Sequence, residues 1–567
     1  MPGILEGLNE SQKQAVTAAV KHLLVIAGPG TGKTLTIVRR IAYLLQQGVP
    51  PDQIIAVTFT NRAAREMRER IETYVGLRSV EMFVGTFHVL GLTILRESLS
   101  EQFAVCTRED QIDLLKQIVG SSTKARSSLE KISRLKNSIE EPDPEMQRVY
   151  EAYENELRRN AMRDFDDLIL LPVNLFETGR AARRFSNVPK HIIVDEYQDI
   201  AAAQYRFLKS LAGAHPLNTL CAVGDSDQAI YGFRGADVQN FLDFRRDFPD
   251  SASVVLGENF RSTRTIMAAA DMVIRNNVKR MEKEVRARKE TGVLIRTVLT
   301  SDEMDEAEFI VREIESRVGG TSHFRMVGNK TPRDYMETSY AFSDFSVLFR
   351  TNTQAGVLRQ AFEQWGIPCQ LVGERHAFRK KKLIETLRSH MDTLPEEFEL
   401  AKLLQIFARE AGVRAEDKEL LFTIAEVYRH LPTRKAISET INELTLFTSA
   451  DAFNPKVDAV ALMTLHMAKG LEFKVVFVAG CEESLLPFVP ARGDADVEEE
   501  RRLFYVGMTR AKDELLLLHA RKRMIYGRVL SRVSSRFVRE IPKEFVIAES
   551  LQEKPKKPKP PQQPGLF

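Results

Sequence analysis

The sequence predicts an α/β protein with two cores, each built on a parallel sheet and each interrupted by a helical segment. Three observations predict this class. Short apolar runs that end in Gly, Asp or Thr recur, and helix-like segments follow them, which is the alternation typical of parallel sheets. The alternation starts again in the second half of the chain. Two long stretches lack it and have the spacing of amphipathic helices.

The first core is expected to begin with the apolar run 22–27, which precedes a glycine-rich turn and an amphipathic stretch at 34–47. A second run at 53–59 precedes another such stretch at 61–74. Two further runs, 191–194 and 217–223, lead into acidic turns. Between these pairs lie helix-like segments such as DQIDLLKQIVG and QRVYEAYENELRRN, so a helical insertion is expected there.

The second core is expected to begin near residue 292, with further strands at 345–349 and 475–478. The segments EFELAKLLQIFARE and KELLFTIAEVYRHL predict a second helical insertion. The polar residues 319–340 predict a surface loop, and the proline-rich end predicts an extended tail. The expected boundaries are 1–91 with 186–260 for the first core, 92–185 for its insertion, 261–382 with 457–546 for the second core, 383–456 for its insertion, and 547–567 for the tail.

Composition excludes several classes of protein. Hydrophobic residues make up 43% of the 567 residues and charged residues 28%, so a largely disordered chain is excluded. No apolar run is long enough to cross a bilayer and the N-terminus does not resemble a secretory signal, so we expect a soluble intracellular protein. The four cysteines are far apart, so a zinc or iron–sulfur site is not expected. The net charge of +3 means that any nucleic acid would be bound in a local groove.

The strongest single motif is AGPGTGKT at residues 27–34, between an expected strand and an expected helix. It is a phosphate-binding P-loop with Ala27 in place of the usual first glycine. The glycines let backbone N–H groups converge on phosphate oxygens. Lys33 then offers a charge to the β- and γ-phosphates, and the Thr34 hydroxyl can bind Mg²⁺. The loop residues expected to bind nucleotide are Ala27, Gly28, Pro29, Gly30, Thr31, Gly32, Lys33 and Thr34.

A P-loop requires an acidic residue at the end of a neighbouring strand, and HIIVDEYQD supplies two. Asp195 is the expected Mg²⁺ partner. Glu196 is placed to orient and deprotonate an attacking water. Together the two motifs predict hydrolysis of a nucleoside triphosphate.

Nine motifs then follow one another in the order found in superfamily 1 DNA helicases, and the chain resembles the UvrD/Rep/PcrA branch from residue 8 to residue 542. The motifs are LNESQKQAV, AGPGTGKT, TFTNRAAREM, GTFH, DEYQD, VGDSDQAIYGFRGA, ENFRST, LMTLHMAKGLEF and EEERRLFYVGMTRA. The resemblance implies two RecA-like P-loop domains with ATP in the cleft between them. It also implies a DNA-dependent ATPase that moves 3′ to 5′ on single-stranded DNA, and a cytoplasmic, nucleoid-associated location.

The resemblance assigns roles around the nucleotide. Gln12 matches the residue that reads adenine, and Phe260 matches the aromatic that stacks on it, with Phe for the usual Tyr. Gln228 matches the γ-phosphate sensor, and Glu472 a residue near the ribose and γ-phosphate. Arg261 and Arg510 match two arginine fingers, which stabilise charge in the transition state. Leu35 stands where the family often has Arg, so base specificity is expected to be looser.

The resemblance also assigns contacts with DNA. Phe59, Tyr231 and Phe233 match aromatics on which bases stack, and stacking does not depend on base sequence. Phe233 replaces the usual Trp, so one platform is expected to be weaker. The residues matched to phosphate contacts or to coupling between the two sites are Asn61, Thr86, His88, Arg234 and His466.

Two regions leave alternatives open. The second insertion is shorter than its counterpart in the family, so either an unwinding helicase or a translocase that displaces proteins without efficient unwinding is compatible with the sequence. A nucleotide-gated DNA-binding scaffold with little turnover is the third alternative. The tail ends in QPGLF, and Gln563, Leu566 and Phe567 resemble a sliding-clamp motif, but five loosely specified residues favour an inert tail. A monomer is expected, with a dimer as the alternative.

Overall fold

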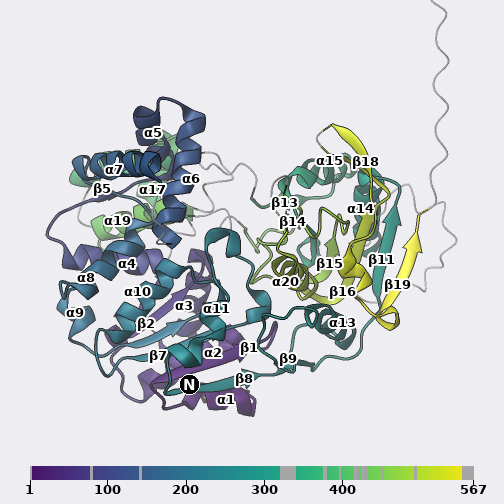
Figure 1. Cartoon of the computed structure of the whole chain (residues 1–567), viewed down its shortest axis with the longest axis horizontal. Coiled ribbons are helices and arrows are strands. Elements are labelled where there is room, and N and C mark those ends of the chain that lie inside the picture. The colour runs from purple at the N-terminus through teal and green to yellow at the C-terminus, as the bar shows by residue number, and fades with distance from the viewer. Residues whose placement is uncertain are drawn as a thin grey trace, which may run out of the picture.

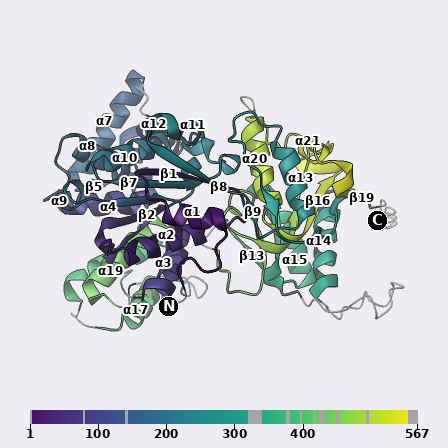
Figure 2. The ribbon, with the colours of Figure 1, turned by 90° about the horizontal axis from the view of Figure 1, so that it is seen from below.

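The computed structural model describes residues 3–76, 81–138, 143–318, 340–373, 380–394, 398–413, 418, 421–422, 428, 431–447, 453–490, 495–525 and 527–551. Two parallel sheets, each covered by helices, lie side by side, and a helical group stands on the first (Figures 1 and 2). The expected class, two parallel α/β cores with helical insertions, is confirmed. The expected loop at 319–340 falls almost entirely outside the described residues, and so does the expected tail from residue 552 onward. The expected start of the tail at residue 547 is wrong, because residues 547–550 belong to a strand that pairs in parallel with residues 295–299 of the second sheet.

The first sheet has the strand order β3-β2-β6-β7-β1-β8 and every pairing in it is parallel. Its strands are β1 (His22–Ala27), β2 (Ile54–Thr58), β3 (Phe83–Thr86), β6 (His191–Val194), β7 (Thr219–Gly224) and β8 (Ser251–Leu256). The helices around it are α1 (Glu10–Thr17), α2 (Lys33–Gln46), α3 (Asn61–Val75), α4 (Phe87–Ser98), α10 (Ala202–Gly213), α11 (Gln239–Leu242) and α12 (Phe244–Asp247).

Both faces of the first sheet are buried, which explains why its strands are apolar runs rather than alternating patterns. Along β1, Leu24 packs into the cluster under α4, α8 (Asp167–Glu177) and α10, while Leu23 and Val25 pack against α2 and α3. Successive side chains of a strand point to opposite faces. The core of the domain is therefore split into two layers by the sheet.

The first insertion stands on this core. It consists of α5 (Arg108–Val119), α6 (Ser122–Ser138), α7 (Pro144–Arg159), α8 (Asp167–Glu177) and α9 (Arg183–Ser186), with a two-stranded pair β4 (Ala104–Val105) and β5 (Met162–Arg163). Lys136 is buried among three carboxylates, those of Glu154 at 2.6 Å, Asp164 at 2.9 Å and Asp167 at 2.8 Å. These acids could otherwise hold a metal ion, but the ammonium group takes the place of one.

The second sheet has the order β13-β14-β12-β15-β16-β11-β19, again with parallel pairings. Its strands are β11 (Ile295–Thr300), β12 (Phe345–Phe349), β13 (Cys369–Leu371), β14 (Val460–Thr464), β15 (Phe473–Val478), β16 (Ala511–Ala520) and β19 (Val546–Ser550). Its helices are α13 (Arg264–Ile274), α14 (Glu303–Val318), α15 (Ala355–Trp365), α20 (Val497–Met508) and α21 (Arg536–Arg539). Two small pairs complete it, β9 (Glu258–Asn259) with β10 (Arg286–Ala287), and the hairpin β17 (Lys522–Ile525) with β18 (Arg528–Ser531).

The second insertion leaves the second core and packs on the first. Its described helices are α16 (Lys380–Ser389), α17 (Leu400–Glu410) and α19 (Thr433–Leu446), and both views show α19 near α3 (Figures 1 and 2). Leu446 belongs to the apolar cluster of the first core. Glu443 forms a buried ion pair with Arg65 of α3, and Asn442 accepts a hydrogen bond from Arg96 at 2.9 Å.

Other expectations from composition can be checked directly. Cys106, Cys221 and Cys481 are buried free thiols, and Cys369 is partly buried. Within the described residues, no helix combines the length and the apolar character needed to span a membrane.

Candidate functional site

The P-loop residues lie between the end of β1 and the start of α2, at the carboxyl edge of the first sheet. Gly30 and Gly32 have φ angles of +65° and +83°, a region that side chains rarely tolerate. A Cβ on Gly30 would also collide with Asn259, whose amide donates to the Pro29 carbonyl at 2.6 Å. Gly32 begins α2 without a side-chain cap, so the first amides of the helix can bind an anion.

The remaining residues expected at the nucleotide surround this loop. Lys33 donates to the Ala27 carbonyl at 3.3 Å. Gln12 is buried, its Nε2 donating to the Thr31 carbonyl at 3.0 Å and its Oε1 accepting from Asn9 N. Phe260 donates its backbone N–H to the Gly30 carbonyl, and its side chain is 48% exposed. An open aromatic face beside a phosphate loop suits the stacking of a base.

Asp195 and Glu196 follow β6, which is separated from the P-loop strand β1 by β7. Glu196 has a φ of +52°, an uncommon conformation that costs a non-glycine residue energy. Burial and the adjacent Glu196 charge raise the pKa of Asp195. Burial would also raise the pKa of Glu196, but the charges of Lys33 and Lys469 outweigh it and lower that pKa. Glu196 is therefore the more acidic member of the pair.

A chain of hydrogen bonds leads from Glu196 to Gln228. Gln198 donates to Glu196 Oε2 at 2.6 Å, and its Oε1 accepts from the Asp225 backbone at 2.9 Å. Asp225 in turn accepts from Gln228 Nε2 at 2.7 Å and from Lys283 Nζ at 2.6 Å. All of these links lie in the first core or in the segment that leaves it, so they fix Gln228 relative to the catalytic candidates.

Lys469 was not among the residues expected from the sequence. It belongs to the second core, and its side chain contacts this series of hydrogen-bonded residues in the first core. It forms an ion pair with Asp199, lies 3.5 Å from Glu196 and donates to the Gln228 carbonyl at 2.7 Å. Burial opposes its charge, but the carboxylates of Asp199 and Glu196 raise its pKa. The sequence signal that could have indicated Lys469 is its position in the motif LMTLHMAKGLEF, between the expected site residues His466 and Glu472.

The two arginines meet at the same cleft. Arg261 donates to Glu472 Oε2 at 2.7 Å and to the Thr509 carbonyl at 3.2 Å. Arg510 is buried and donates to the carbonyls of Val506 at 2.8 Å and Leu471 at 3.1 Å. Burial, together with the positive charge of Arg261, lowers the pKa of Arg510 to about 9, while Glu196 acts in the opposite direction. A polyanion between the two guanidinium groups would relieve their repulsion.

Aromatic side chains line the junction between the cores. Phe59, after β2, stacks on Tyr231 with ring centroids 4.6 Å apart. Phe233 is 63% exposed and meets His466 of the second core edge-on at 5.3 Å. Arg234 lies over the rings of Tyr231 and Phe233. Lys469 lies 5.5 Å from the Tyr231 ring, so one lysine contacts both the aromatic group and the acidic group.

Three expected DNA contacts are placed differently from this group. Thr86 caps α4 by accepting from Val89 N. His88 lies beside Phe165 at 6.2 Å, and burial lowers its pKa to about 4. Asn61 donates its amide to the Leu446 carbonyl at 3.0 Å, so the second insertion occupies it. The clamp-like residues 563–567 lie outside the described residues.

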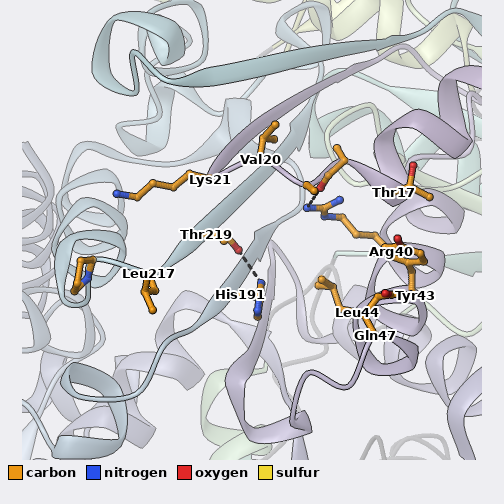
Figure 3. A pocket seen from close by; sticks show the side chains of 13 residues that line it. Thr17, Val20, Lys21, Arg40, Tyr43, Leu44, Gln47, His191, Leu217 and Thr219 are labelled. Atoms are coloured by element: carbon orange, nitrogen blue, oxygen red, sulfur yellow. Dashed lines mark hydrogen bonds between the residues drawn. The ribbon is translucent and has the colours of Figure 1, made fainter.

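A cavity of about 510 Å³ lies elsewhere in the first core (Figure 3). His191 and Thr219, the first residues of β6 and β7, line it, and a hydrogen bond of 2.9 Å joins His191 Nδ1 and Thr219 Oγ1. Arg40 also borders it but donates to the Ala15 and Val16 carbonyls. Because the amino ends of the strands face this cavity, it is opposite the P-loop and is not the nucleotide site.

Comparisons with known proteins agree with this geometry. The model of the UvrD/REP helicase N-terminal domain matches residues 8–249. The model of the UvrD-like helicase C-terminal domain matches residues 254–418 and 385–522. The ATP-dependent DNA helicase PcrA of Staphylococcus aureus is 31% identical over 661 residues, covering 96% of this chain and 88% of the relative. PcrA of Staphylococcus epidermidis is 30% identical, covering 98% and 89%.

Proposed function

The chain belongs to the UvrD/REP helicase family and is an ATP-dependent DNA helicase, and from that premise we propose that it moves 3′ to 5′ along single-stranded DNA by hydrolysing Mg-ATP between its two cores. The observation that carries the proposal is the meeting of first-core and second-core groups at one cleft. Lys469 and Arg510 of the second core face Glu196 of the first. Closure and opening of this cleft would move DNA bound across both cores.

The residues present fit a nucleotide with its metal. The uncapped amides of α2 and the ammonium group of Lys33 suit the phosphates. Gln12 and Phe260 border the same loop on the side suited to the base. Thr34 and Asp195 would hold Mg²⁺, which neutralises charge on the phosphates when bound.

Glu196 is the proposed general base. Lys33 and Lys469 now hold its pKa low, and a triphosphate that engages Lys33 would weaken that effect and make Glu196 more basic. Arg261 and Arg510 would stabilise the charge that develops on the γ-phosphate. Arg261 is paired with Glu472 in this structure, so it would exchange that partner for phosphate.

DNA would stack on Phe59, Tyr231 and Phe233. The stacked rings of Phe59 and Tyr231 would have to separate for a base to lie between them. Lys469 contacts Tyr231 on one side and Asp199 on the other. We propose that this lysine makes the hydrolysis site respond to a base in the groove.

One observation favours a second candidate, a translocase that separates duplex poorly. The alignment with PcrA runs over 661 residues, more than the whole chain contains, so the relative carries insertions that this chain lacks. We place the shortening in the second insertion, whose α19 packs on α3. Roles in DNA repair, replication or recombination, binding of Gln563, Leu566 and Phe567 to a sliding clamp, and a monomeric state also remain proposals.

Phosphate release tests the proposal, measured for the wild type and Lys33→Ala with and without oligo-dT. Lys21→Ala, a surface lysine near β1, serves as the control. We expect strong stimulation by oligo-dT and loss of turnover in Lys33→Ala only. Labelled duplexes with a 3′ or a 5′ tail then test direction and unwinding. Unwinding from the 5′ tail alone would contradict the proposed polarity, and stimulation without unwinding would favour the translocase.

A further inference from the structure

One helix of the second core connects the DNA-facing loop with the arginine at the nucleotide cleft. The Oε1 atom of Glu499, in the first turn of α20, accepts a hydrogen bond from the backbone N–H of Gly232 at 3.1 Å. Gly232 lies between Tyr231 and Phe233 in the first core. Two residues beyond the other end of α20, Arg510 donates to the Val506 carbonyl of the same helix.

The contact at Gly232 is close. A Cβ at this position would collide with the Glu499 carboxylate, so a side chain here would force that carboxylate to move. Asp496 caps α20 by accepting from Glu499 N at 3.0 Å, which holds the first turn in place. A base that stacks on Tyr231 or Phe233 therefore acts on a loop that is already tied to the second core.

The helix is suited to transmit such a displacement. Every residue from Glu500 to Met508 is buried, and twelve residues of α-helix span about 18 Å. Glu498 accepts from Val278 N at 2.8 Å, and Glu500 pairs with Arg350 at 2.6 Å. These neighbours anchor α20 to the segment that follows α13 and to its own sheet, whereas Glu499 alone of the three glutamates contacts the DNA-facing loop.

We propose that Glu499 is a positioning residue that links occupancy of the loop at Gly232 to the placement of Arg510. The inference rests on the proposed function and assigns it a specific route between the two sites. Glu499 itself is not proposed to touch nucleotide or DNA. It acts by accepting one backbone hydrogen bond across the cleft, so any acceptor of similar length should serve.

The test compares ATP turnover with and without saturating oligo-dT for three variants. In Glu499→Ala we expect stimulation by oligo-dT to fall about 10-fold, within the usual range for coupling between sites, while basal turnover stays within about twofold. Glu499→Gln retains an oxygen acceptor and should restore most of the stimulation. Glu363→Ala removes an exposed carboxylate from α15 of the same core and should behave as the wild type.

The outcomes separate the inference from the proposed function. Normal stimulation in Glu499→Ala, equal loss of basal and stimulated turnover, or a Gln variant as impaired as the Ala variant would each overturn the role of Glu499 while the helicase mechanism stands. A wild-type protein that oligo-dT does not stimulate would overturn both.

Discussion

Each core is built on its own parallel sheet, but the helix that follows the equivalent strand begins differently in the two cores. β1 and β11 are each the second strand from one edge of their sheets, flanked by β7 and β8 and by β16 and β19. After β1, the chain enters α2 through Gly32 without a side-chain cap. After β11, Asp302 accepts from Met304 N and Asp305 N at 2.9 Å each, at the start of α14.

This difference decides which core can hold phosphate. A helix N-terminus attracts an anion through its free amides and dipole. In the second core the Asp302 carboxylate already fills that role, whereas in the first core the amides and Lys33 are available. The second core contributes cations instead, Lys469 and Arg510, which point to the cleft. In the proposed mechanism, two similar scaffolds thus divide one reaction between them.

The largest expected effect tests the contribution of the second core. Arg510→Ala should lower oligo-dT-stimulated kcat by about 10³- to 10⁵-fold, because the guanidinium group stabilises charge that develops in the transition state. Steady-state phosphate release measures it, and Arg539→Ala, an exposed arginine of α21, is the control. Unchanged kcat in Arg510→Ala, with ATP binding intact, would show that the second core is not part of the active site.

Lys469→Ala should lower kcat by about 10- to 100-fold, since a hydrogen bond that involves a charged group contributes roughly 1.5–3 kcal/mol. The variant leaves the buried Asp199 without its lysine, so thermal unfolding should be measured in parallel. Lys474→Ala, on β15, removes an exposed ion pair with Asp344 and should change neither quantity. A Lys469→Ala protein with full DNA stimulation would remove this residue from the coupling.

Phe59→Ala should weaken binding of single-stranded DNA by about 1–3 kcal/mol, the usual contribution of one stacked base, and leave ATP affinity unchanged. Fluorescence anisotropy with labelled oligo-dT measures the DNA affinity. Phe398→Ala in the second insertion removes an equally sized ring that is 47% exposed. The Phe398→Ala variant should keep the DNA affinity of the wild type. An equal loss of DNA affinity in the two variants would show that Phe59 does not form a specific stacking site.

The smallest effect concerns His466, at the same groove. Burial, followed by the charges of Arg350 and Arg234, lowers its pKa to about 3, below the unfolded value of about 6.5. Its neutral form therefore stabilises the fold above pH 6.5, and this stability decreases as the pH falls below 6.5 towards the folded pKa. Between pH 7.5 and 5.5 the loss should be about 1.4 kcal/mol.

Urea unfolding at the two pH values measures this loss, with His466→Gln as the comparison. The wild type should lose more stability than the variant on acidification. An identical change in both proteins would show that His466 titrates normally in the folded state.

The features that could be predicted from the sequence are those that depend on residues close together in the chain, such as strands and motifs. β1, β6 and β12 coincide with the expected apolar runs because buried parallel strands are continuous hydrophobic segments. Residues 251–256 and 511–520 were not expected as strands. β8 mixes serine and alanine with valine, and in β16 the first residue is followed by Lys512, Asp513 and Glu514. Neither segment therefore has the continuous apolar sequence that predicts a buried strand.

The contacts between distant segments were out of reach. Lys469 and its partner Asp199 are 270 residues apart, and nothing in their local sequences indicates that they pair. The packing of α19 on α3 depends on Arg65 and Glu443, each of which alone resembles an ordinary surface charge. Such contacts follow from how the domains are arranged, which local sequence patterns do not specify.

In the proposed mechanism groups from both cores act on one triphosphate, and a double-mutant cycle between Glu196→Gln and Arg510→Ala is the decisive test. The measured quantity is single-turnover ATP hydrolysis with saturating oligo-dT. If both residues serve the same transition state, the double variant should be about as slow as the slower single variant, because groups that act as a unit are not additive. Fully additive losses would contradict a shared active site.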